Sequence, residues 1–312
     1  MDRSADELLA GLRERGYQAR FVSVDRVALL QKQISGLRDG GLFDDVFFQE
    51  RLAWFRFNTP QDFPNARSVI VAAIPRPQTR ATFTVGGRRR SLIIPPTYTA
   101  YQQIQEQFEH VAAEILGRKG HSVARTALPL KQLAVRSGLA EYGKNNICYV
   151  SGMGSFLQIV AVYSDLPCVN DGWREPIMMK SCDGCDLCRR ACPTGAIPSD
   201  RFLLHGERCI VYHNEKKGDI PFPEWMAASW HNCLIGCMHC QRACPLDKEF
   251  LGWVEEEEEF SEEETALIME GASHDKVPAT IVEKLEHLSL LEDLDKFPRN
   301  LRVFFKKPSK TS

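Results

Sequence analysis

The sequence predicts an α+β protein in which an α/β domain is followed by a cysteine-rich, ferredoxin-like module and a helical C-terminal cap. Residues 67–74 read RSVIVAAI, a short apolar run rich in β-branched residues and typical of a strand buried on both faces. Across residues 101–119, apolar side chains recur at helical spacing. Nine of the eleven cysteines lie between positions 182 and 244, which predicts a separate metal-binding module.

Local patterns predict the other elements in chain order. We expect a helix over residues 5–16, ending at a glycine that serves as C-cap. Residues 83–90, FTVGGRRR, carry a turn signal and three arginines, for which a solvated basic loop is favoured over an anion contact. A second buried strand is expected over 153–162. The glutamate-rich stretch 254–264 predicts a solvated helix, and apolar spacing through 265–291 predicts a closing helical cap.

These elements divide the chain into three predicted parts. Residues 1–175 form a helical segment with an α/β domain, residues 176–250 form a double [4Fe-4S] domain, and residues 251–312 form a helical extension. Small cluster domains are rich in loops because the metal supplies order that an apolar core otherwise provides.

Composition narrows the class of protein. With 312 residues, 44% of them hydrophobic, the chain can bury a full core, and its formal charge of -2 gives no bias toward nucleic acid. No apolar stretch approaches the roughly 20 residues that a membrane helix needs. The acidic, arginine-containing start also lacks the apolar core of a secretion signal. We therefore expect a soluble cytoplasmic protein without a membrane partner.

The most specific motif is CDGCDLCRRACP, from Cys182 to Pro193. Three cysteines spaced by two residues and a fourth spaced by three before a proline form the bacterial ferredoxin pattern for a [4Fe-4S] cluster. Zinc knuckles use paired C-x-x-C elements without the third step, and disulfides require an oxidising compartment. Cluster ligation is therefore preferred to a zinc ribbon or disulfides.

A second cysteine set completes two clusters. In two-cluster ferredoxins the fourth cysteine of each run ligates the other cluster. The first cluster is then assigned Cys182, Cys185, Cys188 and Cys244. The second takes Cys192, Cys237 and Cys240, with either Cys209 or Cys233 as its last ligand; we favour Cys209. Cys148 and Cys168 lie outside the module and are expected to be small buried hydrophobic residues.

An ordered series of motifs resembles a known family. SVIVAAI is followed by RSGLAEYGKNN at 136–146, the first cysteine run, ERCIVYHNEKKGDIP at 207–221, and IGCMHCQRACP. In this order they resemble the epoxyqueuosine reductases, relatives of the reductive dehalogenases, over residues 67–250. The resemblance supports Cys209 as ligand, because the family's R-C-I phrase supplies one.

The resemblance implies a cobalamin-binding domain with a nitroreductase-like fold, joined to a two-cluster ferredoxin-like domain that reduces the cobalt. The glycine-rich loop near the corrinoid corresponds to these residues: Gly138, Leu139, Tyr142, Gly143, Lys144 and Asn145. Absent side chains would permit close approach to a large planar ligand. The D-x-H-x-x-G motif of His-ligating cobalamin proteins is not found, which suits a base-off corrinoid.

The chain departs from the family where the chemistry is expected. The family's catalytic aspartate, in a V-D-T-A-P phrase, is replaced by Ala124-Arg125-Thr126, and an R-Y-x-x-G-R-D-Y-H phrase by residues 93–98. The C-terminal part lacks the family's helical repeat for tRNA. Protonating a departing oxygen needs a positioned donor. The candidate donors are Tyr98, Tyr101, Glu141 and Tyr142.

Three functions remain open. The first is an iron–sulfur reductase whose two clusters deliver electrons to a base-off corrinoid, acting on a small substrate or on the corrinoid of a partner protein. The second is a ferredoxin-like electron-transfer protein without substrate chemistry. The third, epoxyqueuosine reduction in tRNA, ranks last because the acid and the repeat are missing. An external donor such as ferredoxin or flavodoxin is expected as a partner.

Overall fold

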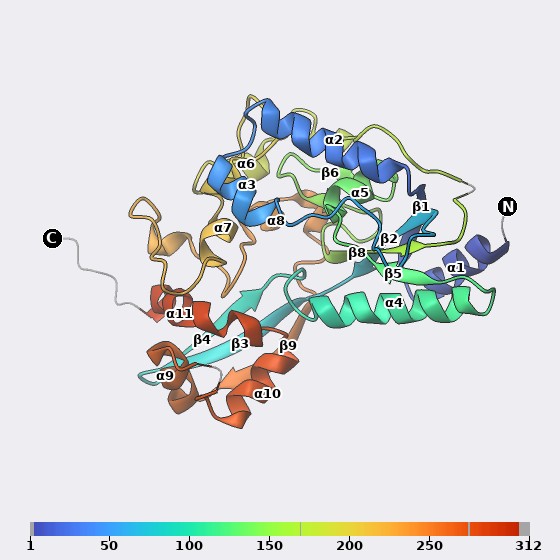
Figure 1. The fold of residues 1–312 in the computed structure, drawn as a ribbon. Coiled ribbons are helices and arrows are strands. Elements are labelled where there is room, and N and C mark those ends of the chain that lie inside the picture. Colours follow the sequence, from blue (N-terminus) through green and yellow to red (C-terminus); the bar gives the residue numbers. More distant parts are fainter. Residues whose placement is uncertain (1–2, 169, 274, 306–312) are drawn as a thin grey trace. The chain divides into compact units, whose positions relative to one another are not determined.

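The computed structural model describes residues 3–168, 170–273 and 275–305, and the chain divides into two compact units (Figure 1). Unit 1 comprises Met1–Arg76, Gln102–Arg189 and Ile197–Gly206. Unit 2 comprises Pro77–Tyr101, Arg190–Ala196 and Glu207–Ser312. Both contain helices and sheet, which confirms the α+β class. The predicted three-part division by function stays a prediction.

Unit 1 is built around an antiparallel sheet with the strand order β1-β2-β8-β5. Its strands are β1 (Gln18–Ser23), β2 (Ser68–Pro75), β5 (Val123–Arg125) and β8 (Leu157–Ser164). Its helices are α1 (Arg3–Glu14), α2 (Arg26–Asp39), α3 (Asp45–Arg51), α4 (Tyr101–Gly117) and α5 (Leu130–Arg136). A two-residue hairpin, β6 (Glu141–Tyr142) with β7 (Cys148–Tyr149), follows α5.

Helices cover both faces of the unit 1 sheet, and Figure 1 shows α2 and α4 on opposite sides of it. Every residue of β2 from Ser68 to Ile74 is buried, as its apolar run predicted. On one face Val69 and Val71 pack in a core with residues of α2 and α5. On the other, the Gln105 side chain of α4 donates to the carbonyl oxygen of Ala161 at 3.1 Å. The sheet thereby forms a rigid support for the loops at its edge.

Unit 2 contains a second sheet with the order β4-β3-β9. β3 (Gln78–Val85) and β4 (Arg88–Ile94) form an antiparallel hairpin, and β9 (Val254–Phe260) runs parallel to β3. The sheet shares a core with α9 (Glu262–Glu270), α10 (Ala279–His287), η5 (Leu291–Lys296) and α11 (Phe297–Phe305). At its centre the rings of Phe83 and Phe260 stack with centroids 4.7 Å apart.

The prediction of a solvated helix over 254–264 is wrong for residues 254–260, which form β9. Carboxylates of this strand meet the arginines of the β3–β4 hairpin, in the ion pairs Arg80–Glu256 and Arg89–Glu259. Such cross-strand pairs of opposite charge stabilise a sheet. The helical pattern begins only at Glu262. The basic 83–90 segment therefore contacts the chain's own carboxylates.

The cysteine-rich segments contain only short helical turns, as expected for a cluster domain. These are η1 (Lys180–Cys182), α6 (Leu187–Ala191), η2 (Gly206–Arg208), α7 (Ile210–Asn214), η3 (Ala228–Trp230), α8 (His239–Arg242) and η4 (Pro245–Asp247). Within the described ranges, no helix combines the length and apolar character that a membrane crossing requires.

Candidate functional site

The first three cysteines of the ferredoxin run lie in unit 1 at the end of η1 and the start of α6. Cys182 donates its amide hydrogen to the carbonyl oxygen of Met179 at 2.9 Å, and Cys185 donates to Cys182 at 3.2 Å. Cys182, Cys185 and Cys188 are half-buried, and none of them forms a disulfide. A cluster held here would be partly exposed on unit 1.

The β6–β7 hairpin contains the last four predicted cofactor-binding residues, Tyr142 to Asn145, and lies against the first cysteine run. The Lys144 ammonium donates to the carbonyl oxygen of Cys185 at 2.7 Å. On β6, the Tyr142 amide donates to Ile177 and its carbonyl accepts from Met179, both at 2.9 Å. Residues 177–179 lead directly into η1. The structure thus brings together two motifs that are about 40 positions apart in the sequence.

The hairpin's own turn uses the remaining polar groups. Gly143 donates to the carbonyl oxygen of Ile147 at 2.9 Å, and Asn146 adopts a left-handed φ of 58°. The Asn145 amide donates to the Tyr149 hydroxyl at 2.9 Å, and its oxygen accepts from the Ile147 N–H at 3.3 Å. Asn145 therefore stabilises the turn from within.

The space beside the two loop glycines is filled by the chain itself. Gly138 has φ +75°, and a Cβ there would lie 3.3 Å from Nε of Arg174. A Cβ on Gly143 would lie 2.5 Å from Oδ1 of Asn145 and 2.7 Å from the Tyr149 ring. Neither glycine opens a gap for a ligand in this structure. Leu139 is also buried, at 6% exposure, and supports the loop.

An exposed apolar surface adjoins the hairpin and the first cysteines. It consists of four side chains with 37–42% of their surface exposed: Ile177, Met178, Leu187 and Phe202, named here the cluster-one patch. The Tyr142 ring lies 5.0 Å from the Phe202 ring and extends the patch onto β6. Grouped exposed apolar residues mark binding surfaces. In chemical character these residues fit a large ligand with apolar faces.

The other six cysteines of the module lie in unit 2. Cys209 is the N-cap of α7, and burial raises the pKa of its thiol to about 11, with the Cys192 and Glu215 charges adding to the rise. Burial likewise raises the pKa of Cys237 to about 12, and the Cys209 and Cys192 charges raise it further. These three thiols therefore lie within electrostatic range of one another.

The donor set suits iron–sulfur ligation. None of the cysteines in the described part of the chain forms a disulfide, and iron binding deprotonates cysteine thiols. No group of three His, Cys, Asp or Glu side chains among the described residues converges on a single metal ion. A [4Fe-4S] cluster does not require this, because each cysteine binds a different iron atom.

Cys209 and Cys233 remain the two candidates for one ligand position. Cys233 is 1% exposed and forms a backbone bridge with Ile93. Burial, followed by the charge of Cys237, raises the pKa of its thiol well above the usual value. Both cysteines are close enough to Tyr98 to act on it electrostatically. The preference for Cys209 stays a prediction.

The four candidate proton donors lie in different surroundings. Tyr98, in unit 2, donates its hydroxyl hydrogen to the Glu215 carboxylate. Tyr101 is 42% exposed at the start of α4. Glu141 and Tyr142 are half-buried on β6, and burial raises the pKa of Tyr142 far above the usual value. Of the four, Tyr142 is the one in contact with the cluster-one patch.

The stretch 124–126, which the sequence predicted to replace the family's aspartate phrase, contains a cation. Arg125, at the end of β5, donates from Nε to Oε1 of Glu109 on α4 at 2.6 Å. The Thr126 hydroxyl donates to the carbonyl oxygen of Ala161 at 3.5 Å. These contacts tie the segment to the sheet and to α4.

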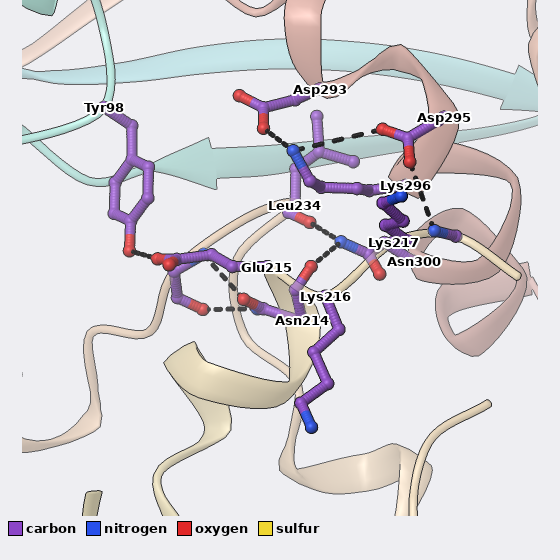
Figure 2. A network of polar contacts seen from close by, with 12 residues as sticks. Tyr98, Asn214, Glu215, Lys216, Lys217, Leu234, Asp293, Asp295, Lys296 and Asn300 are labelled. Carbon is purple, nitrogen blue, oxygen red and sulfur yellow. Dashed lines mark hydrogen bonds and ion pairs between the residues drawn. The ribbon is translucent and has the colours of Figure 1, made fainter. Parts of the chain in front are cut away.

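Sequence reasoning missed a polar network in unit 2 (Figure 2). The Asn214 side chain pairs with both main-chain groups of Gly236, at 2.7 and 3.1 Å. The Asn300 amide of α11 donates to the carbonyl oxygens of Asn214 and Leu234, each at 3.0 Å. In the sequence, the position of Asn214 and Glu215 shortly after the R-C-I phrase was the only indication of this network. Nothing in the sequence around Asn300 indicated its part in it.

The fold and the thiol set define an iron–sulfur protein. The family model described as "4Fe-4S double cluster binding domain" matches residues 181–247, which contain all nine cysteines of the module. The match agrees with the prediction of two clusters from cysteine spacing.

Comparison with known proteins confirms the resemblance to the epoxyqueuosine reductases. The chain is 32% identical over 154 residues to the epoxyqueuosine reductase of Burkholderia pseudomallei, covering 47% of this chain and 37% of that protein. It is 26% identical over 237 residues to the Staphylococcus aureus enzyme, covering 73% and 60%. The chain spans less than half the length of the first curated relatives it matches.

Solved structures agree on the fold. The epoxyqueuosine reductase of Streptococcus thermophilus has a TM-score of 0.67 at 17% identity, covering 97% of this chain and 80% of that chain. An epoxyqueuosine reductase with an epoxyqueuosine-modified tRNA-Tyr stem loop has a TM-score of 0.68 at 20% identity, covering 96% and 80%. A catabolic reductive dehalogenase has a TM-score of only 0.38, which is too low to support a shared fold.

Proposed function

We propose that this chain is an iron–sulfur reductase in which two [4Fe-4S] clusters deliver electrons to a corrinoid beside the β6–β7 hairpin. One observation carries the proposal: the hairpin and the first cysteine run are joined by the Lys144–Cys185 hydrogen bond and by the pairing of Tyr142 with residues 177–179. A ligand on this hairpin would lie next to the first cluster. An external reduced ferredoxin or flavodoxin would supply the electrons, in the cytoplasm, where thiols stay reduced.

The proposed ligands of the first cluster are Cys182, Cys185, Cys188 and Cys244, and those of the second are Cys192, Cys209, Cys237 and Cys240. The pKa effects among Cys192, Cys209 and Cys237 support the second set. Replacing Cys209 with alanine should remove about four iron atoms per chain after anaerobic reconstitution, because one cluster is lost. Cys233→Ala should retain both clusters; the reverse result would exchange the two assignments.

The corrinoid would be held by the cluster-one patch and the hairpin. A bound corrinoid supplies a cobalt centre able to break a carbon–oxygen bond reductively. The chain's part is to cover the apolar ring faces with Ile177, Met178 and Phe202 and to present a proton. We propose the Tyr142 hydroxyl as that donor, because its ring lies against Phe202 of the cluster-one patch and a tyrosine hydroxyl is protonated at neutral pH.

The proposed substrate is epoxyqueuosine in tRNA. This choice reverses the ranking of substrates made from the sequence. There, the missing aspartate and helical repeat made a small-molecule substrate preferable to tRNA. The relatives support the change because those cited are named epoxyqueuosine reductases, and one related structure holds a modified tRNA stem loop. A Tyr142 donor would replace the aspartate.

The test has two parts. In the first, anaerobically reconstituted protein is mixed with cobalamin and examined for a corrinoid spectrum. In the second, the gene is expressed in cells that lack their own epoxyqueuosine reductase, and the tRNA of these cells is analysed for queuosine. We expect corrinoid binding and restored queuosine, with Tyr142→Phe retaining binding and losing most of the restoration. Binding without restoration would refute the tRNA substrate.

The alternative is an electron-transfer protein without substrate chemistry. It is favoured by Arg125, which lies paired with Glu109 where the family has an acid. Reconstituted protein that carries both clusters, reduces a redox partner and binds no corrinoid would support this alternative over the reductase.

A further inference from the structure

Figure 2 shows a tyrosine–carboxylate pair in unit 2, the unit that also contains the second cysteine set. The Tyr98 hydroxyl donates to the carboxylate of Glu215, the residue that ends α7. Since α7 begins directly after Cys209, the carboxylate and this thiol occupy opposite ends of a helix of five residues. The proposed reaction uses neither Glu215 nor its hydrogen bond with Tyr98.

The pair is electrostatically coupled to the cysteines. The charge of Glu215 contributes to the raised pKa of the Cys209 thiol, after burial and the Cys192 charge. Burial first, and then the charges of Glu215, Cys209 and Cys233, raise the pKa of Tyr98. The same negative charges therefore act on the phenol and on the cysteine that would bind iron.

Packing fixes where the pair lies. Gly236 has φ +76°, and a Cβ there would lie 2.6 Å from the Tyr98 ring, so the ring contacts the backbone just before Cys237. Asn214, the neighbour of Glu215, is bonded to both main-chain groups of Gly236. Asn300 then holds the carbonyl oxygens of Asn214 and Leu234. These buried bonds fix the backbone next to Glu215, and the Tyr98 hydroxyl holds its carboxylate.

We propose that Glu215, held in place by Tyr98, lowers the reduction potential of the second cluster. Reduction adds one electron from the external donor to the cluster and neither forms nor breaks a covalent bond. A fixed negative charge nearby opposes the arrival of that electron, and cluster potentials respond to local charge and hydrogen bonding. Tyr98 acts as a positioning residue: its hydroxyl donates to the carboxylate and holds it in place. The inference rests on the proposed function only in requiring that Cys209 binds a cluster.

A redox titration followed by electron paramagnetic resonance tests the proposal. The full chain is reconstituted anaerobically and titrated with dithionite at constant pH as wild type, Glu215→Gln, Tyr98→Phe and Glu224→Gln. Glutamine keeps the size and the acceptor oxygen of Glu215 and removes its charge. Glu224, exposed in the same unit, is the matched control for loss of one carboxylate.

We expect Glu215→Gln to raise the potential of one cluster and to leave the other unchanged. The expected change is about tenfold in the reduction equilibrium, equivalent to about 59 mV for one electron. Tyr98→Phe should shift the same cluster in the same direction by a smaller amount, because the carboxylate loses the hydrogen bond that holds it in place. Glu224→Gln should shift neither.

Two clusters with unshifted potentials in Glu215→Gln would overturn the inference and leave the proposed function standing. An equal shift in Glu224→Gln would also overturn it, since the effect would then reflect net charge. If Glu215→Gln fails to hold its clusters, Tyr98→Phe decides: a higher potential of one cluster supports the proposal, and an unchanged or lower one refutes it. A wild-type protein that binds no cluster would overturn both proposals.

Discussion

Replacing Asn214 with alanine should destabilise unit 2 strongly. The Asn214 side chain makes two hydrogen bonds to the buried main chain of Gly236, at 2.7 and 3.1 Å, in the manner of a backbone pair. Alanine would leave the Gly236 N–H and C=O without these partners. A buried polar group left unsatisfied costs about 1–3 kcal/mol, so the two together should lower the free energy of unfolding by about 2–5 kcal/mol.

Urea unfolding followed by circular dichroism measures this change. With a slope of about 3 kcal/mol per molar urea, a loss of 3 kcal/mol moves the midpoint down by about 1 M. Asn65→Ala, at an exposed position, is the control and should change stability by less than about 0.5 kcal/mol. A midpoint for Asn214→Ala equal to that of the control would refute the reasoning that this pair closes a buried network.

Two further predictions concern unit 2. A Cβ on Gly218 would lie 1.7 Å from the carbonyl oxygen of Asp295, so Gly218→Ala should lower the thermal unfolding midpoint by several degrees. Gly252 has open space around it, and Gly252→Ala should leave the midpoint unchanged. Equal midpoints for the two variants would contradict the predicted clash. The Glu258 carboxylate lies 2.7 Å from the His287 ring and raises the pKa of that imidazole. The small stabilisation of the folded protein by this ion pair is therefore present below pH 6.5 and is lost as the pH rises through the raised pKa. NMR titration should show a higher His287 pKa in wild type than in Glu258→Gln, and identical values would exclude the contact.

The sequence predicted the elements whose signal is local. The apolar run 67–74 is a strand buried on both faces, because seven consecutive apolar or small residues leave no face for water. The helix at 101–117 likewise follows from its periodic apolar positions. The strand β9 could not be predicted in this way, since its glutamates are stabilised by arginines of the β3–β4 hairpin, about 170 positions away.

The same distinction holds for the site. Spacing identified the cysteines, because a cluster ligand motif must be local in sequence to wrap one corner of the cluster. The glycines of the loop at 138–145 were expected to permit close approach of a planar ligand, and in this structure Arg174 and Asn145 lie beside them. Its position beside Cys185 depends on the Lys144 hydrogen bond, which no spacing rule contains.

The sequence by itself determined that this protein has a cysteine module for two iron–sulfur clusters and resembles the epoxyqueuosine reductases. Those properties belong to short motifs, whose chemistry depends on residue type and local spacing. Only the tertiary structure decided that the hairpin at Tyr142 adjoins the first cysteines, and that Tyr98 holds Glu215 near the second set. Such contacts join segments far apart in the chain, and packing and buried hydrogen bonding select them only when the whole fold has formed.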